Sequence, residues 1–115
     1  MSVIAISQQL WFEEDPRGAT LTCRSGEGST ATIFHVGISR QSLQEFNQEL
    51  IKGSSRWTIR DGSLLAQGDR EALTLRFSSC VGPAVEASLS LYGIELEAFR
   101  WAVHAFAAQS ETALN

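Results

Sequence analysis

The sequence is poor in the residues on which metal sites, disulfide scaffolds and basic binding surfaces depend. Its 115 residues include two cysteines, two histidines, two prolines and a single lysine. No apolar run approaches the ~20 residues that cross a bilayer, and the first residues lack the basic region and long apolar stretch of a signal peptide. These absences predict a cytoplasmic protein with no metal, no cofactor and no transmembrane helix.

The two cysteines form no Cys-x-x-Cys pair. Cys23 and Cys80 fall in or beside strand-like segments, so we expect both to be small buried apolar residues in a reducing compartment. A Cys23–Cys80 disulfide is the alternative, which the rarity of such bridges in the cytosol disfavours.

Positive charge is scarce. Thirteen acidic and nine basic residues give a net charge of -4, and the eight arginines are spread along the chain. A negative surface is repelled by nucleic-acid phosphates and anionic lipids, which disfavours both as partners. With 43% apolar residues, the composition predicts a single globular domain over 1–115, with a frayed tail over 110–115.

Alternating apolar and polar residues predict strands in both halves of the chain. The segment 3–12 is predicted as one strand, followed by an acidic turn over 13–18. The dipeptide Asp61-Gly62 suits a two-residue hairpin turn because both of its residues tolerate positive φ. The seven predicted strands lie within 3–12, 20–24, 31–36, 57–59, 64–65, 73–77 and 85–91.

Two segments have apolar residues at helical spacing. The first is predicted to begin after an N-cap at Ser39 and to end at Gly53. The second is predicted over 95–109, with Glu95 and Glu97 near its start, where they complement the helix dipole. The apolar faces are expected to consist of Leu43, Phe46, Leu50 and Ile51 in the first helix and Leu96, Phe99, Ala102, Val103 and Phe106 in the second.

The order of these elements predicts the fold class. We expect an α+β protein in which a six- to seven-stranded antiparallel sheet carries two helices on one face, in the order β-β-β-α-β-β-β-β-α. The spacing i, i+3, i+7 of the first helix recurs in the second, which suggests an internal pseudo-repeat. Coincidence between two amphipathic sheet-and-helix units is the alternative.

Candidate catalytic and ligand-binding residues are isolated from one another. His35 and His104 stand alone in a strand and a helix, without metal-ligand spacing. Gly26 and Gly28 lack the later glycine and the lysine of a phosphate-binding loop. The chain is therefore expected not to be an enzyme.

Carboxylates offer two weaker possibilities for chemistry. The cluster Glu13-Glu14-Asp15 lacks the Asp-x-Asp-x-Asp-Gly pattern of a calcium loop. An acid–base pair of the glycosidase type would need two carboxyls roughly 5–9 Å apart, which sequence spacing does not establish. The candidates for such a pair are Glu86, Glu95 and Glu97.

The remaining candidates are contact residues. Trp101 lies off the apolar stripe of its helix, and the dipeptide Trp11-Phe12 puts two large rings on opposite faces of a strand. Tryptophan and arginine are the residue types that anchor protein interfaces, so Trp11, Arg100 and Trp101 are candidate interaction residues. In the alternative, both tryptophans merely cover the ends of the core.

Ten apolar residues carry a resemblance over the chain from Val36 onward: Leu43, Phe46, Leu50, Trp57, Leu73, Leu75, Phe77, Leu96, Phe99 and Val103. They outline a strand, a helix, a Trp, a run of antiparallel strands and a second helix. This layout resembles a group of small bacterial immunity proteins, the antidotes of polymorphic and contact-dependent toxins. The resemblance implies a non-enzymatic inhibitor that binds a toxin, often a basic nuclease, through an acidic surface. Glu13, Glu14 and Asp15 with Trp11 would then form part of that surface.

Three other functions stay open from the sequence. The first is a small acidic secretion chaperone, which shelters an effector segment on a dimeric sheet-and-helix body. Such proteins usually open with a helix, whereas this chain is predicted to open with a strand. A ligand-binding or enzymatic curved-sheet domain would need a pocket lined by Trp57, Phe77 and Tyr92. A single-stranded nucleic-acid binder would need exposed aromatics for stacking. A homodimer through the Trp101 helix face is a further option.

Overall fold

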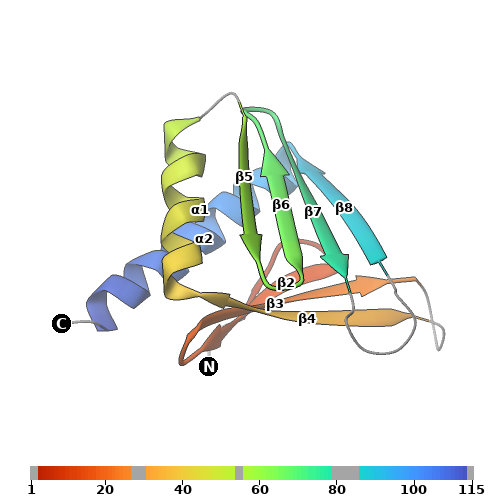
Figure 1. The fold of residues 1–115 in the computed structure, drawn as a ribbon, viewed down its shortest axis with the longest axis horizontal. Helices are drawn as coiled ribbons and strands as arrows, with labels where there is room; N and C mark the ends of the chain where they lie inside the picture. The colour runs from red at the N-terminus through yellow and green to blue at the C-terminus, as the bar shows by residue number, and fades with distance from the viewer. Residues whose placement is uncertain (1–2, 27–30, 54–55, 79–85, 114–115) are drawn as a thin grey trace.

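The computed structural model describes residues 3–26, 31–53, 56–78 and 86–113. Four strands precede each of two helices, so the chain runs twice through the order β-β-β-β-α (Figure 1). The elements are β1 (Val3–Ala5), β2 (Leu10–Asp15), β3 (Gly18–Ser25), β4 (Thr32–Ser39), α1 (Arg40–Lys52), β5 (Trp57–Asp61), β6 (Leu64–Gly68), β7 (Ala72–Ser78), β8 (Glu86–Tyr92) and α2 (Ile94–Ala113). The predicted α+β class with antiparallel pairing is confirmed.

The prediction of one six- to seven-stranded sheet was wrong. The strands form two antiparallel sheets of four, with β1 to β4 in sheet 1 and β5 to β8 in sheet 2. Within each sheet every strand pairs with its neighbour along the chain. The helix α1 separates β4 from β5, so local hairpins build each sheet independently.

The segment 3–12 is two strands, not one. The amides of Ile6 and Ser7 both donate to the carbonyl oxygen of Leu10, at 2.9 and 3.0 Å, and close a turn between β1 and β2. Ile4 then lies opposite Phe12. This turn contains neither Gly nor Pro, so the sequence carries no strong turn signal between the two strands.

The acidic segment was also misplaced in the prediction. Glu13, Glu14 and Asp15 belong to β2, and the turn to β3 consists of Pro16 and Arg17 alone. Gly18 begins β3 with φ of 150°, and a Cβ at this position would lie 2.2 Å from the carbonyl oxygen of Ile38. The hairpin therefore depends on a glycine where β3 passes close to β4.

Both ends of α1 are confirmed. The Ser39 hydroxyl accepts a hydrogen bond from the amide of Ser42 at 3.1 Å, and Gly53 ends the helix at φ of 61°. Ile51 was predicted on the apolar face, but its side chain is 70% exposed. It follows Leu50 by one residue, which turns it ~100° around the helix axis and out of the buried stripe.

The second half differs from the prediction in two details. The hairpin between β5 and β6 is confirmed, but its two loop residues are Gly62 and Ser63, and only Gly62 has positive φ. The second helix continues to Ala113, beyond its predicted end at residue 109. Residues 114–115 of the predicted tail lie outside the described residues.

The two sheets meet at a steep angle, and both helices lie on one side of the pair (Figure 1). Each helix contacts both sheets: α1 touches β3, β4 and β5, and α2 touches β3 and β8. The helices also pack against each other. The prediction that both helices cover one face of a single sheet was therefore wrong. Each helix packs against both sheets.

One buried cluster fills the space between these layers. Phe34 and Phe77 join the inner faces of the two sheets, with ring centroids 5.9 Å apart. Phe12 contacts Phe99 of α2 at 5.3 Å, and Phe46 of α1 also contacts Phe99, at 5.9 Å. Such pairs contribute about 0.5–1.5 kcal/mol each beyond the burial of their area. The aromatic contacts therefore hold sheets and helices in one core.

Candidate interaction surface

The histidines and the described cysteine form no reactive cluster. Among residues 3–26, 31–53, 56–78 and 86–113, no group of three or more His, Cys, Asp or Glu could hold a metal ion. Cys23 is buried, and burial raises the pKa of its thiol, which keeps it a thiol at neutral pH. Cys80 of the alternative disulfide and Gly28 of the glycine-containing loop lie outside the described residues.

Each histidine has a polar neighbour. The Nδ1 atom of His35 lies 3.1 Å from the hydroxyl of Thr22 on the neighbouring strand. The Nδ1 atom of His104 lies 3.3 Å from Oδ1 of Asn47, and this contact joins α2 to α1. Both contacts link secondary-structure elements, as expected of structural histidines.

The three carboxylates considered for acid–base chemistry do not converge. Glu86 begins β8, whereas Glu95 and Glu97 begin α2 after the other end of the same strand. A strand of this length spans roughly 20 Å at 3.3 Å per residue. That separation is too large for Glu86 to act with either glutamate of α2 on one glycosidic bond. Glu95 and Glu97 are two residues apart in a helix, so their side chains leave the helix axis about 200° apart.

The predicted ligand pocket does not form as expected. Trp57 and Phe77 are buried in the core, while Tyr92 is 66% exposed at the end of β8. Trp57 lies over Gly68, where an added Cβ would come within 2.5 Å of the indole ring. Trp57, Phe77 and Tyr92 therefore do not line one pocket. Two open surface depressions of about 350 and 380 Å³ lie beside Trp57, and polar side chains, among them Arg56 and Thr58, form most of their lining.

The structure divides the acidic cluster of β2. The strand alternation places Trp11 and Glu13 on the outer face of sheet 1, and the indole Nε1 donates to Oε1 of Glu13 at 3.2 Å. Glu14 is exposed on the alternate side. Asp15 accepts hydrogen bonds from the amide of Arg17 at 2.8 Å and the hydroxyl of Thr20 at 3.2 Å. Asp15 thus supports the hairpin, and Glu13 and Glu14 point in different directions.

Trp11 belongs to a row across the outer face of sheet 1. It lies opposite Thr22, which in turn lies opposite His35. Thr22 is fully buried despite its outward direction, and Trp11 is half-buried. Its neighbour Phe12 points inward and is fully buried, so one of these adjacent rings does leave the core.

Arg100 and Arg70 together connect three elements. Arg100 makes two contacts within the molecule. Its Nη1 atom forms an ion pair with Glu97, and its Nη2 atom donates to the carbonyl oxygen of Arg70 at 3.4 Å. The Nε atom of Arg70 donates to the carbonyl oxygen of Gly53 at 2.8 Å. The two arginines thereby link α2, the turn between β6 and β7, and the end of α1. Most of the Arg100 side chain is engaged within the molecule.

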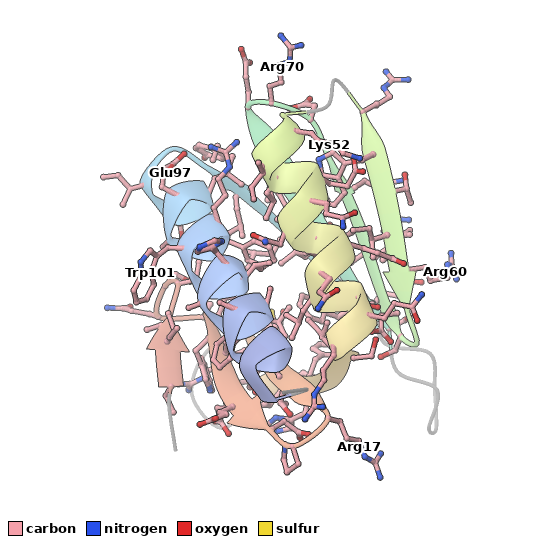
Figure 2. The ribbon with its side chains drawn as sticks, turned by 90° about the vertical axis from the view of Figure 1, so that its left-hand side faces the viewer. Arg17, Lys52, Arg60, Arg70, Glu97 and Trp101 are labelled. Atoms are coloured by element: carbon pink, nitrogen blue, oxygen red, sulfur yellow. The ribbon has the colours of Figure 1, made fainter. Side chains whose placement is uncertain are left out.

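The outward side of α2 carries exposed apolar side chains. Ile94 and Trp101 are 88% and 64% exposed and lie on one stripe with Glu97 and His104. Figure 2 shows Trp101 on the side of α2 that faces away from α1. We call Ile94, Glu97, Trp101 and His104 the α2 stripe. The predicted departure of Trp101 from the buried face is confirmed.

The outer face of sheet 2 has a different character. Two rows of four residues cross its strands, and in them the two arginines are exposed. One row contains Arg60, Leu65, Arg76 and Ser88, and the other contains Thr58, Gln67, Thr74 and Ser90. We call these eight residues the sheet-2 face. Sequence reasoning missed it, although Arg60 and Arg76 each alternate with buried residues in their strands.

Comparison with known proteins gives this chain no relatives. No protein-family model, no curated protein and no solved structure matches it. No helix in the described part of the chain is long and apolar enough to cross a membrane.

Proposed function

We propose that this protein is a non-enzymatic protein-binding module whose contact surface is centred on Trp101. The observation that carries the proposal is the 64% exposure of this indole on a helix whose opposite side is fully used by the core. Ile94 on the same stripe is even more exposed. Large side chains exposed together mark contact surfaces, and tryptophan is among the strongest anchors at such surfaces.

The arrangement of the other candidates supports binding over catalysis. Among the described residues, the histidines, the carboxylates and the cysteine are dispersed or occupied by structural contacts. The aromatic trio expected to line a ligand pocket is split between the core and the surface. These observations therefore favour a surface that binds another protein over a catalytic site.

The partner we propose is a basic protein, and the role is that of a cytoplasmic bacterial immunity protein which neutralises a toxin. The net charge of -4 favours a basic partner. Opposite charge speeds encounter between partners, while buried aromatic anchors hold the complex together.

The test uses the full chain as an affinity bait in lysate from the native cell. Wild type, Trp101→Ala and the control Ile51→Ala are compared, because Ile51 is an equally exposed apolar residue on the other helix. We expect one basic protein to be enriched by wild type and by Ile51→Ala. With that protein purified, Trp101→Ala should weaken binding by about 2 kcal/mol or more, roughly 30-fold. Unchanged affinity would remove Trp101 from the contact surface, and a partner without excess basic charge would contradict the toxin assignment.

A further inference from the structure

The two rows of the sheet-2 face carry charge of the sign opposite to that of the protein. They contain Arg60 and Arg76 and no carboxylate. Because the whole chain carries -4 and these rows carry +2, all other residues together carry -6. The protein therefore presents a local positive surface against a strongly negative remainder.

The two arginines are close together. Leu65 lies between them in the same row, so their Cα atoms are two strand spacings apart, roughly 10 Å. Within the described part of the chain, neither side chain takes part in an ion pair or a hydrogen bond. Arginine side chains are long enough for both guanidinium groups to reach one carboxylate placed above Leu65.

A surface depression lies at this point. It has a volume of about 170 Å³, and its lining includes Arg60, Leu65, Arg76 and the polar residues Ser63 and Ser78. Glu86 borders it from the next row, opposite Ser78. The depression is large enough for a carboxylate group, and its two guanidinium groups outnumber the carboxylate of Glu86 at its edge. The Ser63 hydroxyl is a further donor, whereas the Ser78 hydroxyl already donates to the carbonyl oxygen of Ser63 at 3.2 Å.

The second row adds groups of the kind that form hydrogen bonds with a peptide backbone. Thr58, Gln67, Thr74 and Ser90 offer hydroxyl and amide groups, and the hydroxyls of Thr74 and Ser90 lie 3.4 Å apart. Neither row contains an aromatic ring. The exposed Tyr92 follows Ser90 by two residues on the same face, opposite Ala72 and two rows away from Arg76. Surfaces for single-stranded nucleic acids combine a positive track with stacking rings, so the composition of these rows favours a peptide.

We propose that the sheet-2 face binds an extended acidic segment of a partner protein, with one carboxylate held between Arg60 and Arg76. This site is separate from the α2 stripe, because Figure 2 places Arg60 and Trp101 on opposite sides of the molecule. It serves a partner of opposite charge to the one proposed for Trp101. The protein would thus connect a basic partner on one side with an acidic segment on the other.

The experiment measures fluorescence polarisation of a labelled peptide of alternating Glu and Ser with the full chain, at about 10 mM salt, where the Debye length is about 30 Å. The test variant is Arg60→Gln with Arg76→Gln. The matched control is Arg17→Gln with Arg24→Gln, which removes two exposed arginines from sheet 1 and changes the net charge equally. Thermal unfolding of both variants verifies that they are folded.

We expect saturable binding of the Glu-Ser peptide and none of a Gln-Ser peptide. The test variant should bind about tenfold more weakly, and the control should bind within about twofold of wild type.

Equal losses in the two double variants would overturn the site, since net charge alone would then explain binding. Absence of saturable binding would overturn it as well. The proposal would also be overturned if an oligothymidylate bound more tightly than the Glu-Ser peptide and its binding depended on Arg60 and Arg76 in the same way. The ligand of the sheet-2 face would then be a chain of phosphates and not an acidic peptide. Trp101→Ala should bind the Glu-Ser peptide with wild-type affinity. Failure of the sheet-2 site and failure of the Trp101 contact surface would therefore give different results.

Discussion

Arg70 donates from Nε to the carbonyl oxygen of Gly53 at 2.8 Å, and so joins the turn between β6 and β7 to the end of α1. The last carbonyl groups of a helix have no partner within the helix, so a cation at this position satisfies one of them. The carbonyl oxygen of Arg70 in turn accepts from Arg100 of α2. One turn of sheet 2 therefore contacts the end of α1 and the second turn of α2.

The first prediction concerns this contact. Arg70→Ala should lower the free energy of unfolding by about 0.5–1 kcal/mol, because it removes one exposed hydrogen bond from a charged donor. Urea unfolding followed by circular dichroism measures the change. Arg17→Ala is the control, since Arg17 is an exposed arginine in a turn of sheet 1. A loss of similar size in both variants would show that the bond to Gly53 contributes nothing specific.

Local signals in the sequence were sufficient for both ends of α1. Ser39 and Gly53 define α1 by the chemistry of their own side chains and backbone, independently of the rest of the fold. The position of Trp101 on the exposed side of α2 likewise follows from helical spacing. These features depend on neighbours within one or two turns, which the sequence displays directly.

Sheet organisation could not be predicted in the same way. Alternation tells which residues face a core, but it does not tell which strands pair or where one sheet ends. The separation of Glu13 from Glu14 requires knowing that the segment is a strand and not a turn. Arg60 and Arg76 lie close to each other only because of the register in which β5, β6 and β7 pair. Each of these features is set by contacts between distant segments.

The second prediction concerns a close approach of two strands. Gly18→Ala should destabilise the protein by about 1–3 kcal/mol, because its Cβ would lie 2.2 Å from the backbone oxygen of Ile38 and its φ is 150°. Gly37→Ala on the facing strand is the matched control, since nothing lies within 4 Å of a Cβ there. Thermal unfolding of both variants compares them. A Gly18→Ala protein as stable as Gly37→Ala would show that β3 and β4 can separate at this point without loss.

The third prediction concerns pH. The amides of Glu71 and Ala72 donate to Asp69, at 2.8 and 2.9 Å, and lower the pKa of its carboxyl below the ordinary value of 3.8. Because the folded-state pKa is lower than the unfolded one, the carboxylate stabilises the fold fully above the ordinary value. This contribution is lost as the pH falls through the folded-state value.

Asp69→Asn should therefore be less stable than wild type near neutral pH, and the difference should shrink as the pH falls below about 4. Urea unfolding at a series of pH values measures the difference. Glu71→Gln serves as the control, because it removes a neighbouring exposed carboxylate and keeps both amide bonds to Asp69. A difference between wild type and Asp69→Asn that is constant over this range would contradict the role of the charge.

The fourth prediction concerns the acidic residues of β2 and the basic partner proposed for this protein. Reversal of Glu13, Glu14 and Asp15 to lysine should slow association with that partner by about tenfold, because rim charges act mainly on the rate of encounter. Stopped-flow mixing at low and moderate salt measures the rate constant, and the difference from wild type should shrink as salt increases.

A control of equal charge separates position from net charge. Reversal of Glu45, Glu71 and Glu86 to lysine changes the total by the same amount, and these three exposed residues lie on other elements. Since Asp15 also supports the hairpin through Arg17 and Thr20, Glu13→Lys with Glu14→Lys is measured beside the triple variant. If the control slows association as much as the β2 variants do, the field of the whole protein steers the partner, and the acidic segment of β2 has no special part in the contact surface.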